Sequence, residues 1–101
     1  MVDVIVPIYN AFDSVTKCIE SLLLFSNFKE NRLILIDDKS PDNRIVSYIN
    51  KIVSENEDKN IIFLENDTNM GFVATVNKGM KYSENDVILL NTPRQIQAFV
   101  N

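Results

Sequence analysis

The chain has 101 residues, enough for one small domain, and its 46% of hydrophobic residues is ordinary for a globular protein. Its formal net charge of −4 argues against nucleic-acid binding, because that activity needs a basic face. The chain contains no histidine, which removes the usual general base and the commonest zinc ligand. Proton transfer or metal binding must therefore rely on carboxylates.

The cysteine content and the apolar stretches bear on where the chain works. The single cysteine, Cys18, excludes an intrachain disulfide, and we expect a cytoplasmic location. The longest apolar stretch, 19–25, is interrupted by Glu20 and Ser21 and is shorter than the roughly 20 residues needed to span a bilayer. We expect no transmembrane segment and, from the N-terminal residues, no signal peptide.

The first predicted elements are a strand and a helix. Residues 2–6 form a short β-branched run typical of a strand. Pro7 should end it, because proline cannot donate a hydrogen bond to a neighbouring strand. Apolar residues then recur with helical spacing and predict a helix from residue 12 to about residue 26. Asn10 or Asp13 can cap its start.

A second strand and helix follow. Residues 33–36 are apolar on both faces, which is typical of a central strand in a parallel sheet. Ser40 and Pro41 are a helix-start signal, with serine at the N-cap and proline at the first helical position. The buried stripe of this helix covers 45–53, and a polar loop occupies 55–60.

The remaining predicted elements are a third strand, a third helix and a fourth strand. Residues 61–64 and 87–90 are the strands, and Gly71 opens the helix between them. Gly79 weakens this helix by roughly 1 kcal/mol relative to alanine. The apolar stripe of the helix consists of Phe72, Val76 and Met80, with Val73 beside them.

This order of elements, β-α-β-α-β-α-β, predicts an α/β domain. Its sheet should be parallel, with right-handed crossovers and helices on both faces. A polar cluster follows each strand, and in a parallel sheet all these clusters lie at the edge where α/β proteins bind ligands. The clusters cover residues 7–10, 37–40, 65–71 and 91–92. The sequence therefore predicts a nucleotide site at this edge.

Asp37 and Asp38 follow the second strand directly. Buried adjacent carboxylates raise each other's pKa, but at a solvated edge both can stay ionised. One can then accept a hydrogen bond from a base N–H while the other braces the loop. Alternatively, both are solvated turn residues that precede Ser40.

Three residues near the third helix form a second candidate group. Gly71 allows a ligand to approach the backbone at a helix N-terminus, which favours anions. Asn77 is a poor helix former that could bond a ligand or a loop, and Asn69 precedes both. Alternatively, Gly71 serves only the turn and Asn77 only fixes a neighbouring loop. Tyr9 either stacks on a base or covers the core.

Five segments occur in a characteristic order and spacing. They are Val-Ile-Val-Pro-Ile-Tyr-Asn at 4–10, Ile-Asp-Asp-Lys-Ser at 36–40, Asn-Met-Gly-Phe at 69–72, Asn-Lys-Gly at 77–79 and Val-Ile-Leu-Leu-Asn-Thr at 87–92. Together they resemble the inverting family 2 glycosyltransferases over about residues 2–92. The resemblance implies a GT-A-type fold whose first half, here 1–92, binds a nucleotide sugar.

The resemblance also implies roles for individual residues. The nucleotide-binding residues would be Pro7, Tyr9, Asp37, Asp38, Asn69, Gly71 and Asn77. The first four would hold the base and ribose, and the last three would close the pocket. Asp38 would accept the hydrogen bond from uracil N3–H, so the expected donor is UDP-linked.

The family also places a divalent metal, Mn²⁺ or Mg²⁺, on the sugar diphosphate through a carboxylate motif after the fourth strand. Here Asn91 fits the first position, but Pro93 replaces the acid and cannot ligate through its side chain. We therefore expect an incomplete metal site with no metal ligand or catalytic residue assigned. Residues 93–101 match nothing in the family, as if a frameshift or early stop had intervened. The acceptor half, with its catalytic carboxylate, is absent from the chain.

The function predicted from this resemblance is that of a donor-binding half. The family moves a sugar from a nucleotide donor to a glycan or lipid acceptor with inversion, and we expect this chain alone to lack that activity. The alternative is a non-catalytic nucleotide-binding module or an inactive remnant. A sheet that stops at 87–90 leaves the outer edge of that strand uncovered, so self-association is also expected.

Overall fold

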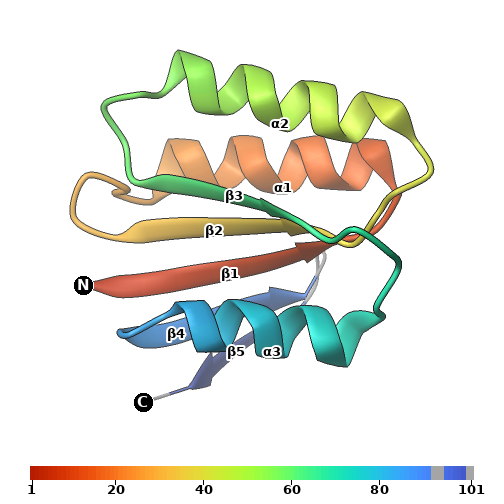
Figure 1. The fold of residues 1–101 in the computed structure, drawn as a ribbon. Coiled ribbons are helices and arrows are strands. Elements are labelled where there is room, and N and C mark those ends of the chain that lie inside the picture. Colours follow the sequence, from red (N-terminus) through yellow and green to blue (C-terminus); the bar gives the residue numbers. More distant parts are fainter. Residues whose placement is uncertain (92–94, 100–101) are drawn as a thin grey trace.

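A computed structural model describes residues 1–91 and 95–99, with side chains described through residue 90 (Figure 1). Helices and strands alternate up to the fourth strand, as predicted. In chain order the elements are β1 (Val2–Ile8), α1 (Phe12–Phe25), β2 (Arg32–Asp37), α2 (Asn43–Glu55), β3 (Ile61–Glu65), α3 (Phe72–Tyr82), β4 (Asp86–Asn91) and β5 (Gln95–Phe99).

The strands form one sheet in the order β3-β2-β1-β4-β5. The first four strands are mutually parallel, and β5 runs antiparallel to β4. Helices α1 and α2 cover one face and α3 covers the other (Figure 1). The predicted α/β architecture is confirmed. Because the chain leaves β1 on one face and reaches β4 from the other, the carboxyl end of β1 lies at a switch point of the topology.

The two central strands, β1 and β2, bury both of their faces, as the composition of residues 33–36 predicted for β2. Along β1, Val4 and Val6 pack beneath α1 and α2, whereas Ile5 packs beneath α3. The residues of β2 alternate in the same way, and Leu33 and Ile34 are completely buried on opposite faces. Each such aliphatic side chain stabilises the fold by roughly 1.5–3 kcal/mol.

Strand β1 extends beyond its predicted end. Pro7 lies inside the strand and pairs in register with Ile36 of β2. On the other side, the pairing of β1 with β4 stops at Ile5 opposite Leu89. Pro7 is tolerated there because the β4 ladder, in which it would lack a donor, has already ended.

The start of α1 differs from the prediction. Its N-cap is Ala11, in the left-handed region at a φ of 58°, and no side chain caps the helix. Neither Asn10 nor Asp13 therefore has the predicted role. Asn10 is also left-handed, and its Oδ1 accepts a hydrogen bond from the backbone N–H of Asp42 at 3.2 Å. The end of the helix at residue 25 agrees with the prediction.

The cap of α2 is Asp42 rather than the predicted Ser40. Asp42 Oδ1 accepts a hydrogen bond from the backbone N–H of Arg44 at 3.0 Å. The Ser40 hydroxyl is already engaged, since it donates to Asp37 Oδ1 at 2.6 Å and accepts from the N–H of Asn10 at 2.9 Å. Because its hydroxyl is bonded to Asp37 and Asn10, Ser40 does not cap α2.

Gly79 lets α3 lie directly on the sheet. A Cβ atom at this position would lie 2.8 Å from Ile36 Cδ1 and 3.0 Å from Ile5 Cγ2. Both distances are shorter than side-chain contacts normally allow. The helix therefore keeps a residue that weakens it because the close approach of helix and sheet requires it.

The outer side of β4 differs from the prediction, which left it uncovered. Strand β5 pairs along β4 from Asn91 opposite Gln95 to Val87 opposite Phe99, so that edge is covered. The expectation of an uncovered β4 edge is therefore wrong, and self-association stays a prediction.

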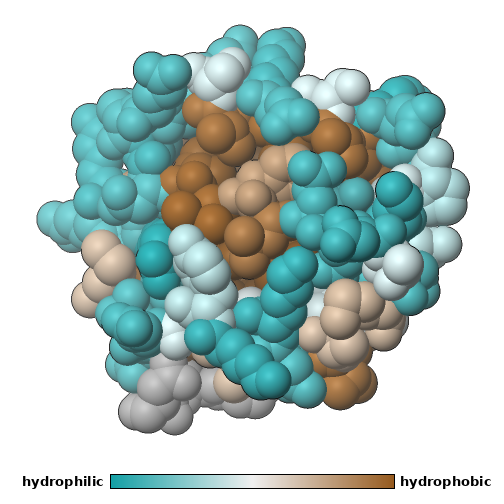
Figure 2. Space-filling view, viewed as in Figure 1, coloured by the Kyte–Doolittle hydropathy of each residue, from teal (hydrophilic) through white to brown (hydrophobic). Residues whose placement is uncertain are grey.

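The α3 face of β3 is less well covered. Helix α3 packs on β1 and β2, and Figure 2 shows a hydrophobic area over β3. Ile62 and Leu64 of β3 are only partly buried there.

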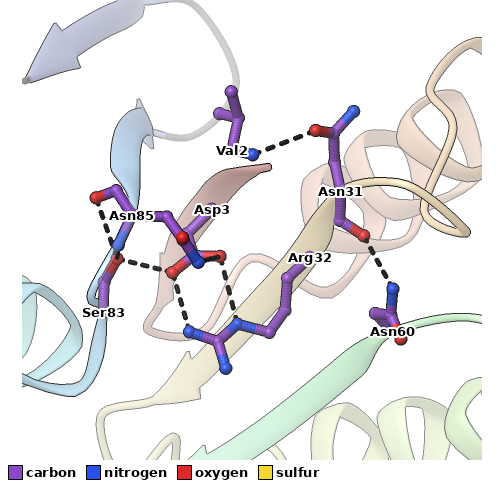
Figure 3. A network of polar contacts seen from close by, with 7 residues as sticks. All are labelled: Val2, Asp3, Asn31, Arg32, Asn60, Ser83 and Asn85. Carbon is purple, nitrogen blue, oxygen red and sulfur yellow. Dashed lines mark hydrogen bonds and ion pairs between the residues drawn. The ribbon is translucent and has the colours of Figure 1, made fainter.

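A polar network ties the amino ends of the central strands together (Figure 3). The Asp3 carboxylate is completely buried and accepts two hydrogen bonds from Arg32, at 3.0 and 2.8 Å. It also accepts bonds from the Ser83 hydroxyl and, at 3.2 Å, from Asn85 Nδ2. Burial raises the pKa of this carboxyl, but the hydrogen bonds from Arg32, Ser83 and Asn85 outweigh burial and lower it.

Within the parts of the chain that the structure describes, no helix combines the length and apolar character that crossing a membrane requires.

Candidate functional site

A pocket of about 360 Å³ opens at the carboxyl end of β1, beside the start of α3. This is the switch point of the sheet, where ligands of α/β proteins bind. It is lined by Pro7, Ile8, Tyr9, Asp38, Asn69, Gly71, Phe72 and Thr75. Five of the predicted site residues are therefore brought together, whereas Asp37 and Asn77 lie outside the pocket.

The Asp38 carboxylate holds the loop between β3 and α3. Its Oδ1 accepts hydrogen bonds from the Met70 N–H at 2.7 Å and from Asn66 Nδ2 at 2.9 Å. Its Oδ2 accepts from the Gly71 N–H at 2.9 Å and from Asn69 Nδ2 at 3.3 Å. A carboxylate offers about four acceptor sites, and here the chain itself occupies all of them.

Asp38 is only 4% exposed, so the alternative of a solvated turn residue is wrong. Burial raises the pKa of its carboxyl. The hydrogen bonds from Met70, Asn66 and Gly71 together outweigh burial and hold that pKa below its usual range. Asp38 is therefore ionised at neutral pH because of its donors, not because of solvent.

The same bonds change the interpretation of Gly71. The two backbone N–H groups just before α3 were expected to bind a ligand's anion, but Asp38 supplies the anion itself. Gly71 has a φ of 88°, a conformation that favours glycine, and a Cβ atom there would meet nothing within 4 Å. The turn therefore requires the glycine, and close packing does not.

Two residues behind Asp38 were missed by sequence reasoning. Asn66 is buried, and its Nδ2 also donates to Thr75 Oγ1 at 3.0 Å. Its Oδ1 accepts a hydrogen bond from Lys78 Nζ at 2.8 Å, which fixes the orientation of the amide. The available signals were the position of Asn66 directly after β3 and the polar Thr75 one turn into an apolar helix.

Asp37 braces a neighbouring loop. Its carboxylate is buried and accepts hydrogen bonds from the hydroxyl and the backbone N–H of Ser40. Of the two predicted roles for the acidic pair, bracing the loop fits Asp37. Of the acidic pair, only Asp38 lines the pocket.

Asn77 is exposed and lies beside Ala74 and Lys81 on another part of α3. It follows Thr75, which lines the pocket, by two residues, and this turns it about 200° around the helix axis. Asn77 thus lies on the predicted helix, but the helix is rotated so that this residue faces away from the pocket.

Two aromatic side chains lie partly exposed in the pocket. Tyr9 is 51% exposed, so its alternative role as a cover for the core is not supported. Phe72 was predicted to belong to the buried stripe of α3 but is 46% exposed. It occupies the first position of the helix, at the edge of the sheet, whereas Val76 one turn later is buried.

The expected divalent metal has no fitting set of ligands in the part of the chain that the structure describes. No three His, Cys, Asp or Glu side chains come together there. The one carboxylate of the pocket is already bonded to donors of the chain. Asn91 ends β4, and Thr92 and Pro93 lie outside the described residues.

A family model described as "Glycosyl transferase family 2" matches residues 3–91. The chain belongs to glycosyltransferase family 2. The match runs from the second residue of β1 to the end of β4 and includes every predicted nucleotide-binding residue. None of the curated proteins matches the chain.

Solved structures of similar fold are GT-A glycosyltransferases. The mannosyltransferase PcManGT from Pyrobaculum calidifontis, in complex with GDP-Man and Mn²⁺, superposes with a TM-score of 0.78 at 16% identity, covering 89% of this chain and 26% of that one. TarS 1–349 from S. aureus, in complex with UDP-GlcNAc, gives 0.76 at 26% identity, with the same two coverages. GalNAc-T7 with UDP, GalNAc and Mn²⁺ gives 0.76 at 14% identity, covering 90% and 18%. The chain thus spans about a quarter or less of these structures.

Proposed function

We propose that this family 2 chain binds the nucleotide of a UDP-linked sugar in the pocket between β1 and α3, as the donor-binding half of an inverting glycosyltransferase. The observation that carries the proposal is a buried, ionised carboxylate, Asp38, beside an exposed aromatic ring, Tyr9. A base offers a ring to stack and N–H groups to donate. The similarity to TarS, solved with UDP-GlcNAc, supports this choice of ligand.

Asp38 accepts the N3–H of uracil by exchanging one of its present donors. The bond from Asn69 Nδ2 is the longest of the four at 3.3 Å, and Asn69 is exposed. This donor can turn away without disturbing the loop, because Met70 and Gly71 keep their bonds to Asp38. A carboxylate favours uracil over cytosine, whose N3 carries no proton and would repel it.

In this function the remaining predicted residues support the nucleotide from around the base. Pro7 lines the pocket at the end of β1, and Gly71 sets the turn that begins α3. Asp37 keeps the loop beside Asp38 in place through Ser40. Asn77 has no described contact with the pocket, so we assign it no part in binding.

Sugar transfer to a glycan or lipid acceptor needs a base that deprotonates the attacking hydroxyl, and we assign that group to a part of the enzyme outside this chain. The chain's own contribution is to bind and orient the nucleotide, in the cytoplasm. We assign no step to a metal ion, since the described residues contain no cluster of three or more His, Cys, Asp or Glu side chains that could hold one. The alternative function is that of a nucleotide-binding module without transfer activity, or of an inactive remnant.

The test is calorimetric titration of the full chain with UDP and CDP. We expect saturable UDP binding and at least tenfold weaker CDP binding. Asp38→Asn should lose at least tenfold in UDP affinity while its circular dichroism spectrum stays folded. Asp67→Asn makes the same charge change at an exposed position of the same loop and should stay within twofold. No saturable UDP binding to the wild-type chain would refute the proposal and favour the remnant.

A further inference from the structure

We propose that Phe72 makes a second aromatic contact with the nucleobase, so that the base binds between Tyr9 and Phe72 with its edge on Asp38. This inference rests on the proposed nucleotide binding and extends it to a residue that the sequence assigned to the hydrophobic core. It names a planar heteroaromatic ring as the group that the pocket recognises.

The exposure of Phe72 carries the argument. Phe72 is 46% exposed and is not part of the cluster in which Val76 and Met80 of the same helix pack. Tyr9 is similarly exposed and lines the same pocket from the end of β1. A planar ligand that covered both rings would remove this apolar surface from water and gain stacking contacts.

The backbone just before Phe72 is hydrogen-bonded to Asp38, the proposed acceptor for the edge of the base. The preceding N–H, that of Gly71, donates to Asp38 Oδ2 at 2.9 Å. The Gly71 carbonyl accepts the first helical bond, from the Thr75 N–H at 3.1 Å. Phe72 therefore starts the helix at a position set by Asp38, which is a requirement for a preorganised binding slot.

The pocket is thus supplied by distant parts of the chain, with the aromatic rings from β1 and α3 and the carboxylate from the end of β2. The lining offers rings and a hydrogen-bond acceptor, and it includes no lysine or arginine for a phosphate. Recognition by this slot therefore concerns the base, and a diphosphate would extend away from it.

The first test compares Phe72→Ala with Val73→Ala by calorimetry, using uridine and UDP as probes. Val73 is 70% exposed, adjacent, and not part of the pocket, which makes it the matched control. We expect Phe72→Ala to weaken both ligands by about tenfold and by the same factor, since stacking acts on the base alone. Phe72→Leu should also bind more weakly, because it keeps bulk but loses the ring. Affinities within twofold of Val73→Ala would overturn the inference.

The second test uses the absence of tryptophan from the chain. Phe72→Trp introduces the chain's single tryptophan, whose selectively excited emission should be quenched saturably by UDP, whereas Val73→Trp should not respond. An unresponsive Phe72→Trp that still binds UDP in the calorimeter would overturn the inference alone. If the wild-type chain binds neither uridine nor UDP, the proposed function fails, and this inference fails with it.

Discussion

At the scale of the residue, Asp38 combines two roles that are usually separate. In the proposed function it supplies the acceptor for a base, and in the structure it already supplies the anion that holds the start of α3. The usual conflict, that a buried charge is costly, is resolved because four donors converge on it. The carboxylate can therefore be both buried and charged before any ligand arrives.

Asp38→Ala should lower the free energy of unfolding by about 2–3 kcal/mol, because it leaves buried donors of Asn66, Met70 and Gly71 without an acceptor. The measurement is urea denaturation followed by circular dichroism. Asp67→Ala, at an exposed position of the same loop, should change stability by no more than about 0.5 kcal/mol. A loss below 1 kcal/mol for Asp38→Ala would show that water replaces the missing acceptor.

At the scale of the element, α3 shows how packing overrides propensity. Its glycine is unfavourable for an isolated helix, yet the side chains of Ile5 and Ile36 occupy the space that any larger residue would need. Helix and sheet thus approach each other most closely where position 79 has no side chain.

Gly79→Ala should destabilise the protein by about 1–2 kcal/mol, because overpacking outweighs the gain in helix propensity. Ile36→Val removes the Cδ1 atom that a new Cβ would meet at 2.8 Å. The double variant should therefore be more stable than the sum of the single effects implies, as a double-mutant cycle by chemical denaturation would reveal. A Gly79→Ala protein more stable than the wild type would contradict this packing argument.

At the same scale, the sequence predicted the helices and the first four strands but not the helix caps or the last strand. The type and order of the elements through β4 were predicted, because buried parallel strands and amphipathic helices have distinct periodicities. The helix caps were not, since Ser40 and Asn10 are bonded to partners that are distant in sequence or in another loop. Strand β5 was missed because the polar–apolar alternation covers only residues 95–98, and so short a run is a weak strand signal.

The candidate site was predicted in part for a related reason. Residues that directly follow strands were placed well, because the carboxyl edge of a parallel sheet gathers them, as at Tyr9 and Asp38. Residues on α3 were not, since sequence alone does not give the rotation of a helix about its axis. Phe72 and Thr75 face the pocket, and Asn77 does not.

At the scale of the whole molecule, two buried carboxylates hold the opposite ends of the parallel strands. At the amino ends, Asp3 joins β1 and β2 to the segment before β4. At the carboxyl ends, Asp38 joins the end of β2 to the start of α3. Each has a pKa lowered by its hydrogen-bond donors in spite of burial. Stability should accordingly depend on both being ionised.

Acidification should therefore unfold the protein. Because the folded pKa of each group lies below its unfolded value, the stabilisation is present above about pH 4 and is lost as the pH falls through the folded pKa. Urea denaturation from pH 7 to pH 2.5 measures this slope. Asp3→Asn should be less stable at pH 7 and lose less on acidification; a slope equal to that of the wild type would rule out Asp3 as a source.

The bonds of Asp3 also have a consequence for how the chain folds as it is made. Ser83 lies 80 residues after Asp3, so this buried carboxylate is synthesised long before one of its partners. At cellular rates of translation the interval is roughly 4 to 16 s. Strand β1 can pair with β2 in that time, but its other side must wait for β4. During synthesis the future centre of the sheet is temporarily its edge, so the open side of β1 can pair with other chains until β4 is made.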